Sequence, residues 1–104
     1  MNKERINQTL NNLFSLENKV ILMTGGAGAI GSEIAKCYAN LGAKVVIADV
    51  NKDSMNEVGD EIRKDGGEVT LMNLNLLEED SISEVVENTI EKYGKIDDKD
   101  LNEA

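Results

Sequence analysis

Glycines are concentrated between residues 24 and 31, directly after an apolar run that begins at Val20. Gly26, Gly28 and Gly31 match G-x-G-x-x-G, and an overlapping pattern, T-G-x-x-G-x-x-G, begins at Thr24. Glycine lets the backbone approach a ligand closely, and a helix starting here would direct its free N–H groups at that ligand. This predicts a diphosphate site formed by Thr24, Gly25, Gly26, Gly28, Ala29, Ile30 and Gly31. The alternative is an ordinary glycine-rich turn without a ligand.

A carboxylate follows the next apolar run at a distance that suits the same ligand. Asp49 lies 18 positions after Gly31, near the place where dinucleotide-binding folds carry an acid that binds the ribose. A carboxylate there accepts hydrogen bonds from both ribose hydroxyls and repels the additional 2′-phosphate of NADP. No Lys or Arg lies in the glycine-rich loop to offset this repulsion, so NAD is favoured over NADP. In the alternative interpretation, Asp49 only caps the following turn.

A third polar candidate is Asn75, which follows the third apolar run. Its side-chain oxygen could accept a hydrogen bond from the amino group of adenine. A simple turn residue fits this position equally well.

Three strands and three helices are predicted to position these residues. The strands cover residues 20–23, 45–48 and 69–74, and the helices cover 29–41, 52–64 and 80–93. Asn51 is expected to cap the second helix, while Ser81 and Glu84 match a capping box for the third. The apolar face of the third helix is expected to comprise Ile82, Val85, Val86, Ile90 and Tyr93. The intervals suit right-handed crossovers, so the predicted fold is α/β, a partial Rossmann (doubly wound) fold with parallel strands. In that type of fold the expected order of the three strands is 3-2-1.

Both ends of the chain are predicted to lie outside this fold. Residues 1–14 have apolar side chains at helical spacing and read as a short helical arm, and residues 15–97 form the NAD-binding domain. Residues 98–104 are charged and poor in β-formers, so a polar tail is expected instead of a fourth strand. The first strand would then be an open edge, which would allow pairing with another copy of the chain.

Charge and composition argue against several classes of partner. The formal net charge is −9 and no basic stripe exists, so neither nucleic acid nor an anionic membrane surface is an expected partner. The chain has no His and a single cysteine, Cys37, which excludes a Cys/His zinc site and an internal disulfide. The start of the chain lacks the apolar core of a secretory signal, so a cytoplasmic protein is expected.

The sequence resembles the short-chain dehydrogenase/reductase family, in its shorter single-domain branch. The resemblance is carried by residues 14–31 (FSLENKVILMTGGAGAIG), 42–49 (GAKVVIAD), 65–68 (DGGE) and 91–97 (EKYGKID). The members that it resembles most act on sugar acids and polyols, such as gluconate and mannonate dehydrogenases. The resemblance implies a Rossmann fold and an NAD-dependent oxidoreductase, but it is poorly specific for a substrate.

Two positions depart from the family pattern. The branch usually has T-G-x-x-x-G-x-G, whereas this chain has alanine at position 29 and a glycine one position earlier, at Gly28. That arrangement is similar to the longer, sugar-nucleotide branch. Asn75 stands where members usually carry Asp against the adenine, so the acceptor is retained and the charge is not.

The catalytic residues of the family cannot be assigned to this chain. In full-length members an Asn-Asn-Ala-Gly motif, a Ser and a Tyr-x-x-x-Lys pair follow the matching region, but neither Tyr38 nor Tyr93 has Lys four residues later. The leading hypothesis is therefore the NAD-binding N-terminal portion of a dehydrogenase, truncated and inactive alone. The alternatives are a small module that binds NAD, ADP or AMP, and an oligomerisation module that uses the open sheet edge.

Overall fold

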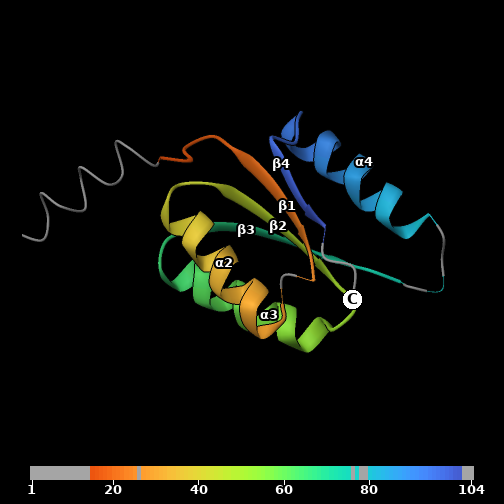
Figure 1. The fold of residues 1–104 in the computed structure, drawn as a ribbon, viewed down its shortest axis with the longest axis horizontal. Helices are drawn as coiled ribbons and strands as arrows, with labels where there is room; N and C mark the ends of the chain where they lie inside the picture. The colour runs from red at the N-terminus through yellow and green to blue at the C-terminus, as the bar shows by residue number, and fades with distance from the viewer. Residues whose placement is uncertain (1–14, 26, 76, 78–79, 102–104) are drawn as a thin grey trace, which may run out of the picture.

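The computed structural model describes residues 15–25, 27–75, 77 and 80–101. Its centre is a four-stranded parallel sheet in the order β3-β2-β1-β4 (Figure 1). The strands are β1 (Val20–Thr24), β2 (Lys44–Asp49), β3 (Glu68–Asn73) and β4 (Asp98–Leu101), and the helices are α2 (Ala29–Asn40), α3 (Lys52–Lys64) and α4 (Ser81–Tyr93). The predicted α/β Rossmann-like fold and the edge position of β3 next to β2 are confirmed.

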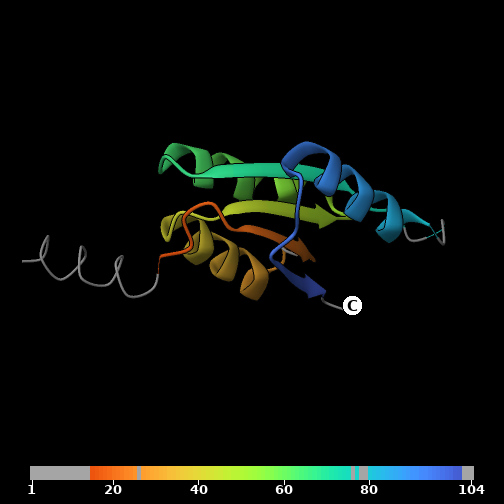
Figure 2. The same cartoon turned by 90° about the horizontal axis from the view of Figure 1, so that it is seen from above.

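Helices cover both faces of the sheet, with α2 and α3 on one face and α4 on the other (Figure 1). The four strands point the same way in Figure 2. Right-handed crossovers explain this arrangement: two steps from β1 to β3 place their helices on one face, and the return from β3 to β4 places α4 on the opposite face. The two apolar strands at the centre of the sheet, β1 and β2, are therefore buried between two layers.

Alternate residues of the strands enter two separate cores. Ile21 and Ile47 pack with Ala35 of α2 and Ile62 of α3, whereas Leu22, Val46 and Ala48 pack with Val85 of α4. Leu22, Val46 and Ile47 are completely buried. The continuous apolar runs of β1 and β2 thus supply both cores at once, which holds the carboxyl ends of these two strands side by side.

The expectation that no strand follows residue 97 is wrong. β4 pairs in parallel with β1, with Asp98 opposite Ile21. Asp97 fixes the start of this pairing, because its N–H donates to the Val20 carbonyl (2.8 Å) and its Oδ2 accepts from the Val20 N–H (2.8 Å). The backbone groups of a central strand need partners, and this need outweighs the weak β-propensity of the segment. Because β1 lies between β2 and β4, pairing of two copies through an exposed β1 loses its basis.

The predicted apolar face of α4 is only partly correct. Ile82 and Ile90 are 47% and 46% exposed, whereas Val85 is buried. The buried residues of α4 recur at intervals of four and are Ser81, Val85 and Thr89. The Thr89 hydroxyl donates to the Val85 carbonyl (2.7 Å), which satisfies this buried polar group. The side chains of α4 that face the sheet are therefore small, whereas the larger Ile82 and Ile90 are half-exposed.

One of the two predicted helix caps is confirmed. The Asn51 side chain accepts from the Ser54 N–H (3.0 Å) at the start of α3. The capping box at Ser81 is wrong, because Asp80 is the N-cap residue of α4 and makes no side-chain cap bond. The Ser81 hydroxyl instead accepts the N–H of Asn75 (2.9 Å) and joins α4 to the loop after β3.

The two ends of the chain were predicted to lie outside the domain, as an N-terminal arm and a C-terminal tail. The predicted arm, residues 1–14, lies outside the described residues, whereas residues 98–101 of the predicted tail form β4. Among the helices that are described, none is both long enough and apolar enough to cross a membrane.

Candidate functional site

The glycine-rich segment forms a tight turn between β1 and α2, at the carboxyl edge of the sheet. Thr24 is buried at the end of β1. Gly25 has φ +73°, a conformation that favours glycine, and its N–H donates to the Ala48 carbonyl at the end of β2 (2.8 Å). Gly26 lies outside the described residues. The turn is thus attached to the neighbouring strand as soon as it leaves β1.

Gly28 is not required by the fold itself. It has φ −71° and ψ 171°, which any residue adopts, and an added Cβ would meet only the Gly25 carbonyl oxygen, at 3.6 Å. Gly59 differs, because its Cβ would lie 2.9 Å from Cδ1 of Leu71. The absent side chain at Gly28 therefore leaves open space beside the loop.

The start of α2 carries no side chain that neutralises its positive end. The N-cap residue is Gly28, without a side-chain cap, and no acid lies in the first turn of the helix. Ala29 and Ile30 begin the helix and are exposed, while Gly31 is partly buried. The free N–H groups and the helix dipole favour an anion at this position.

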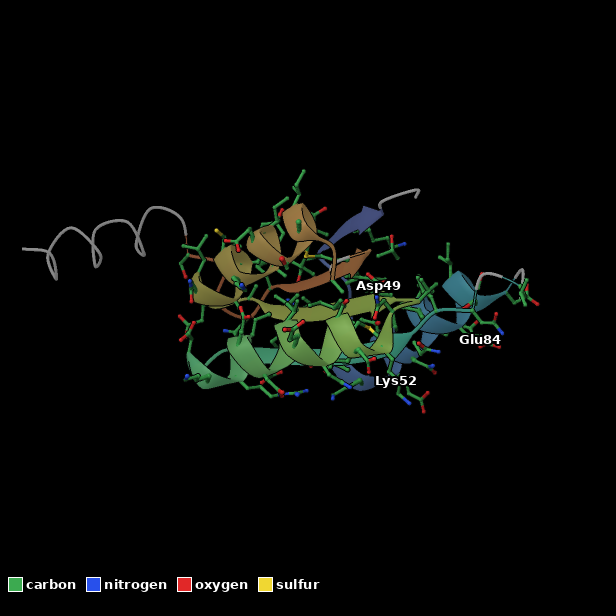
Figure 3. The ribbon with its side chains drawn as sticks, turned by 90° about the horizontal axis from the view of Figure 1, so that it is seen from below. Asp49, Lys52 and Glu84 are labelled. Carbon is green, nitrogen blue, oxygen red and sulfur yellow. The ribbon has the colours of Figure 1, made fainter. Side chains whose placement is uncertain are left out.

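Asp49 ends β2 directly beside this loop, and Figure 3 shows it at the same end of the sheet as Lys52. Its Oδ2 accepts from the Ala27 N–H (3.1 Å), and its Oδ1 accepts from the Asn51 N–H (3.0 Å). The turn-capping role weighed above is therefore present. The ribose-binding role stays a prediction. The bond to Ala27 was not foreseen, because it depends on a loop amide and not on a side chain.

Asn75 lies at the same edge and is exposed. Its Oδ1 accepts from the Leu77 N–H (3.0 Å), so its side chain shapes the turn after β3. The turn role weighed above is therefore present, and the contact with adenine stays a prediction.

Large apolar side chains are exposed shortly after each of β1, β2 and β3, at this edge of the sheet. Ile30 is 79% exposed after β1, Val50 is 50% exposed after β2, and Leu77 is 94% exposed after β3. Val50 and Leu77 were missed by the sequence analysis, although each lies within two residues of a predicted site residue. Exposed apolar groups beside polar ones are typical of sites that take a flat, partly apolar ligand.

Both tyrosines lie at the opposite, amino end of the sheet. The Tyr93 hydroxyl is hydrogen-bonded to the Thr70 hydroxyl (2.7 Å), and the Lys44 ammonium at the start of β2 lies 5.8 Å from the ring centroid. Burial raises the pKa of the Tyr93 phenol above its usual value. Tyr38 lines a hollow with Lys19 and Asp97 at the same end. Neither phenol can serve as an acid or base for a ligand at the glycine loop.

Comparisons with known proteins agree with this geometry. The family model for short chain dehydrogenases matches residues 19–98. An uncharacterized oxidoreductase of Bacillus subtilis is 42% identical over 82 residues, which are 79% of this chain and 30% of that protein.

Solved structures give the same result. A hydroxysteroid dehydrogenase from Escherichia coli has a TM-score of 0.80 and 36% identity, and the match covers 86% of this chain and 37% of that one. A candidate D-mannonate oxidoreductase from Haemophilus influenza, solved with bound NAD, has a TM-score of 0.76 and 31% identity, and the match covers 86% of this chain and 32% of that one. The chain thus spans about a third of the length of these relatives. It belongs to the short-chain dehydrogenase family.

Proposed function

We propose that this chain is the NAD-binding N-terminal portion of a short-chain dehydrogenase/reductase, and that it holds the adenosine and diphosphate half of the cofactor. The observation that carries the proposal is the hydrogen bond of 3.1 Å between Asp49 Oδ2 and the Ala27 N–H. It brings the candidate ribose ligand on β2 to the candidate diphosphate loop after β1, in front of the uncapped start of α2. When bound, NAD supplies the hydride acceptor of the reaction.

The proposed residues fit such a cofactor in three places. The loop amides and the start of α2 face the diphosphate, and the space at Gly28 admits it. Asp49 accepts from the ribose hydroxyls. Asn75 and the exposed apolar groups Val50 and Leu77 lie where the adenine would rest.

NAD is proposed over NADP because of charge. The Asp49 carboxylate would repel a 2′-phosphate, and the nearest base in the sequence, Lys52, is an exposed residue in the first turn of α3. A single exposed ammonium is screened by solvent and offsets little of the repulsion.

We further propose that the chain does not turn over a substrate by itself. Its tyrosines lie at the amino end of the sheet, away from the glycine loop. For the complete enzyme we propose a sugar acid or polyol as substrate, which is supported by the similarity to a candidate D-mannonate oxidoreductase. A nucleotide-binding module without a redox role is the second candidate. It is favoured by the same observation, that both tyrosines lie at the end of the sheet opposite the glycine loop.

The test is a thermal melt followed by circular dichroism, with no ligand, with NAD and with NADP. A ligand that binds only the folded state raises the midpoint by mass action. We expect a cooperative melt that NAD shifts upward more than NADP does. No shift with either nucleotide would refute the binding function. Hydride transfer from a sugar acid or polyol to NAD, catalysed by this chain alone, would refute the proposed lack of turnover.

A further inference from the structure

The Asp49 carboxylate accepts hydrogen bonds from two backbone segments, one of them far from it in the sequence. Its Oδ2 accepts from the Ala27 N–H, 22 residues earlier, and its Oδ1 accepts from the Asn51 N–H. Asn51 in turn caps α3 through the Ser54 N–H. One carboxylate therefore joins the glycine-rich loop after β1 to the turn that starts α3.

The described residues of the loop make two further backbone hydrogen bonds through the N–H groups of Gly25 and Gly28. Within its described residues, Gly25 is held by the Ala48 carbonyl (2.8 Å), and the Gly28 N–H reaches the Gly25 carbonyl only at 3.3 Å. The bond from Ala27 to Asp49 is the contact that attaches the middle of the loop to β2. A carboxylate offers about four acceptor sites, so the two amides leave room for two ribose hydroxyls.

We propose that Asp49 is a positioning residue that holds the glycine-rich loop in its diphosphate-binding shape before any nucleotide arrives. The part of this inference that concerns nucleotides rests on the proposed function, whereas the attachment of the loop does not. If Asp49 acted only by repelling the 2′-phosphate of NADP, removing its charge would allow NADP to bind more tightly. If Asp49 also holds the loop, removing its carboxylate weakens the binding of both nucleotides.

The test compares three variants by hydrogen exchange of backbone amides in the nucleotide-free protein. Asp49→Asn keeps the shape but places an NH₂ group against one of the two N–H donors, so one bond is lost. Asp49→Glu keeps the charge but displaces the carboxylate by one methylene. In Asp49→Asn we expect about tenfold faster exchange at the Ala27 or the Asn51 amide, whichever faces the NH₂ group, and in Asp49→Glu at the Ala27 amide, since each variant disturbs a charge-assisted hydrogen bond. Asp53→Asn removes the same charge four residues later and should leave exchange at Ala27 unchanged.

Nucleotide affinity is measured on the same proteins by titration calorimetry with NAD and NADP. We expect Asp49→Asn to weaken NAD binding at least about tenfold and to give no gain for NADP. The amides of Leu22 and Val46, in the buried strands, report whether each variant is folded.

Each outcome decides the proposal. Unchanged exchange at Ala27 in folded Asp49→Glu, together with unchanged exchange at both Ala27 and Asn51 in folded Asp49→Asn, overturns it, whatever the nucleotides do. Faster exchange together with a gain in NADP affinity overturns the link between loop shape and binding. Faster exchange in a chain whose wild type binds neither nucleotide supports the positioning role and refutes the proposed function.

Discussion

Replacing Gly28 with alanine should separate the stability of the fold from its affinity for a nucleotide. In the ligand-free protein the new Cβ would have the Gly25 carbonyl oxygen 3.6 Å away as its nearest neighbour, and φ is −71°. The methyl group therefore fits without strain. It would, however, project from the loop through which we propose that the backbone contacts the diphosphate.

Two opposite effects are expected from this geometry. A Gly→Ala change that is free of strain stabilises a protein by about 0.4–1 kcal/mol, because the unfolded chain loses conformational freedom. For a domain of this size, 1 kcal/mol corresponds to roughly 4–8 °C in the melting midpoint. NAD at 100 times its Kd stabilises by about 2.7 kcal/mol, and a tenfold weaker affinity would reduce this to about 1.4 kcal/mol. The methyl group should therefore raise the midpoint without NAD and halve the increase that NAD produces.

The assay is a pair of thermal melts, with and without NAD, on the wild type, on Gly28→Ala and on Gly59→Ala. Gly59 serves as the matched control, because its Cβ would lie 2.9 Å from Cδ1 of Leu71 in the α3–β3 contact, away from the loop. Cδ1 is the end of a flexible side chain that can move aside, and alanine is favoured over glycine inside a helix, so we expect Gly59→Ala to melt no lower than the wild type and to retain the full NAD effect.

Two results would refute this reasoning. A full NAD effect in Gly28→Ala would mean that the outer side of the loop does not contact the nucleotide. A lower midpoint of this variant without NAD would mean that the fold itself requires glycine at this position.

The remaining predictions concern stability. The Val20 N–H and the Lys95 ammonium hold the pKa of the Asp97 carboxyl below its usual value. Because the pKa is lower in the folded than in the unfolded state, this contribution is present above the unfolded pKa and is lost as the pH falls through the folded pKa. Urea unfolding should therefore show that Asp97→Asn destabilises the protein at pH 7 and that this destabilisation becomes smaller as the pH falls below the unfolded pKa; an effect that does not change with pH would contradict this. Val85→Ala, in a buried position, should cost about 2 kcal/mol, and Ile90→Ala, in a half-exposed one, less than about 1 kcal/mol. The reverse order in urea unfolding would show that α4 faces the sheet differently.

Local patterns predicted most of the elements. The apolar runs that begin at Val20 and Val45 form β1 and β2, and Asn51 caps α3. These features depend on neighbours within a few residues, so they can be read from the sequence. Which residues of α4 are buried against the sheet could not be predicted in this way. Several of its apolar positions compete for one interface, and only the position of the helix over the sheet decided that Val85 is buried and Ile90 is half-exposed.

The sequence by itself determined the family, the α/β fold and the types of residue at the candidate site, because glycine spacing and apolar runs are local properties. Only the tertiary structure decided two further features. A charged segment after Asp97 became β4, since the backbone of β1 needed partners on that side. Asp49 reached the Ala27 amide, since parallel pairing of β1 with β2 ends both strands at one edge. Both features are contacts between distant segments, which a pattern along the chain does not record.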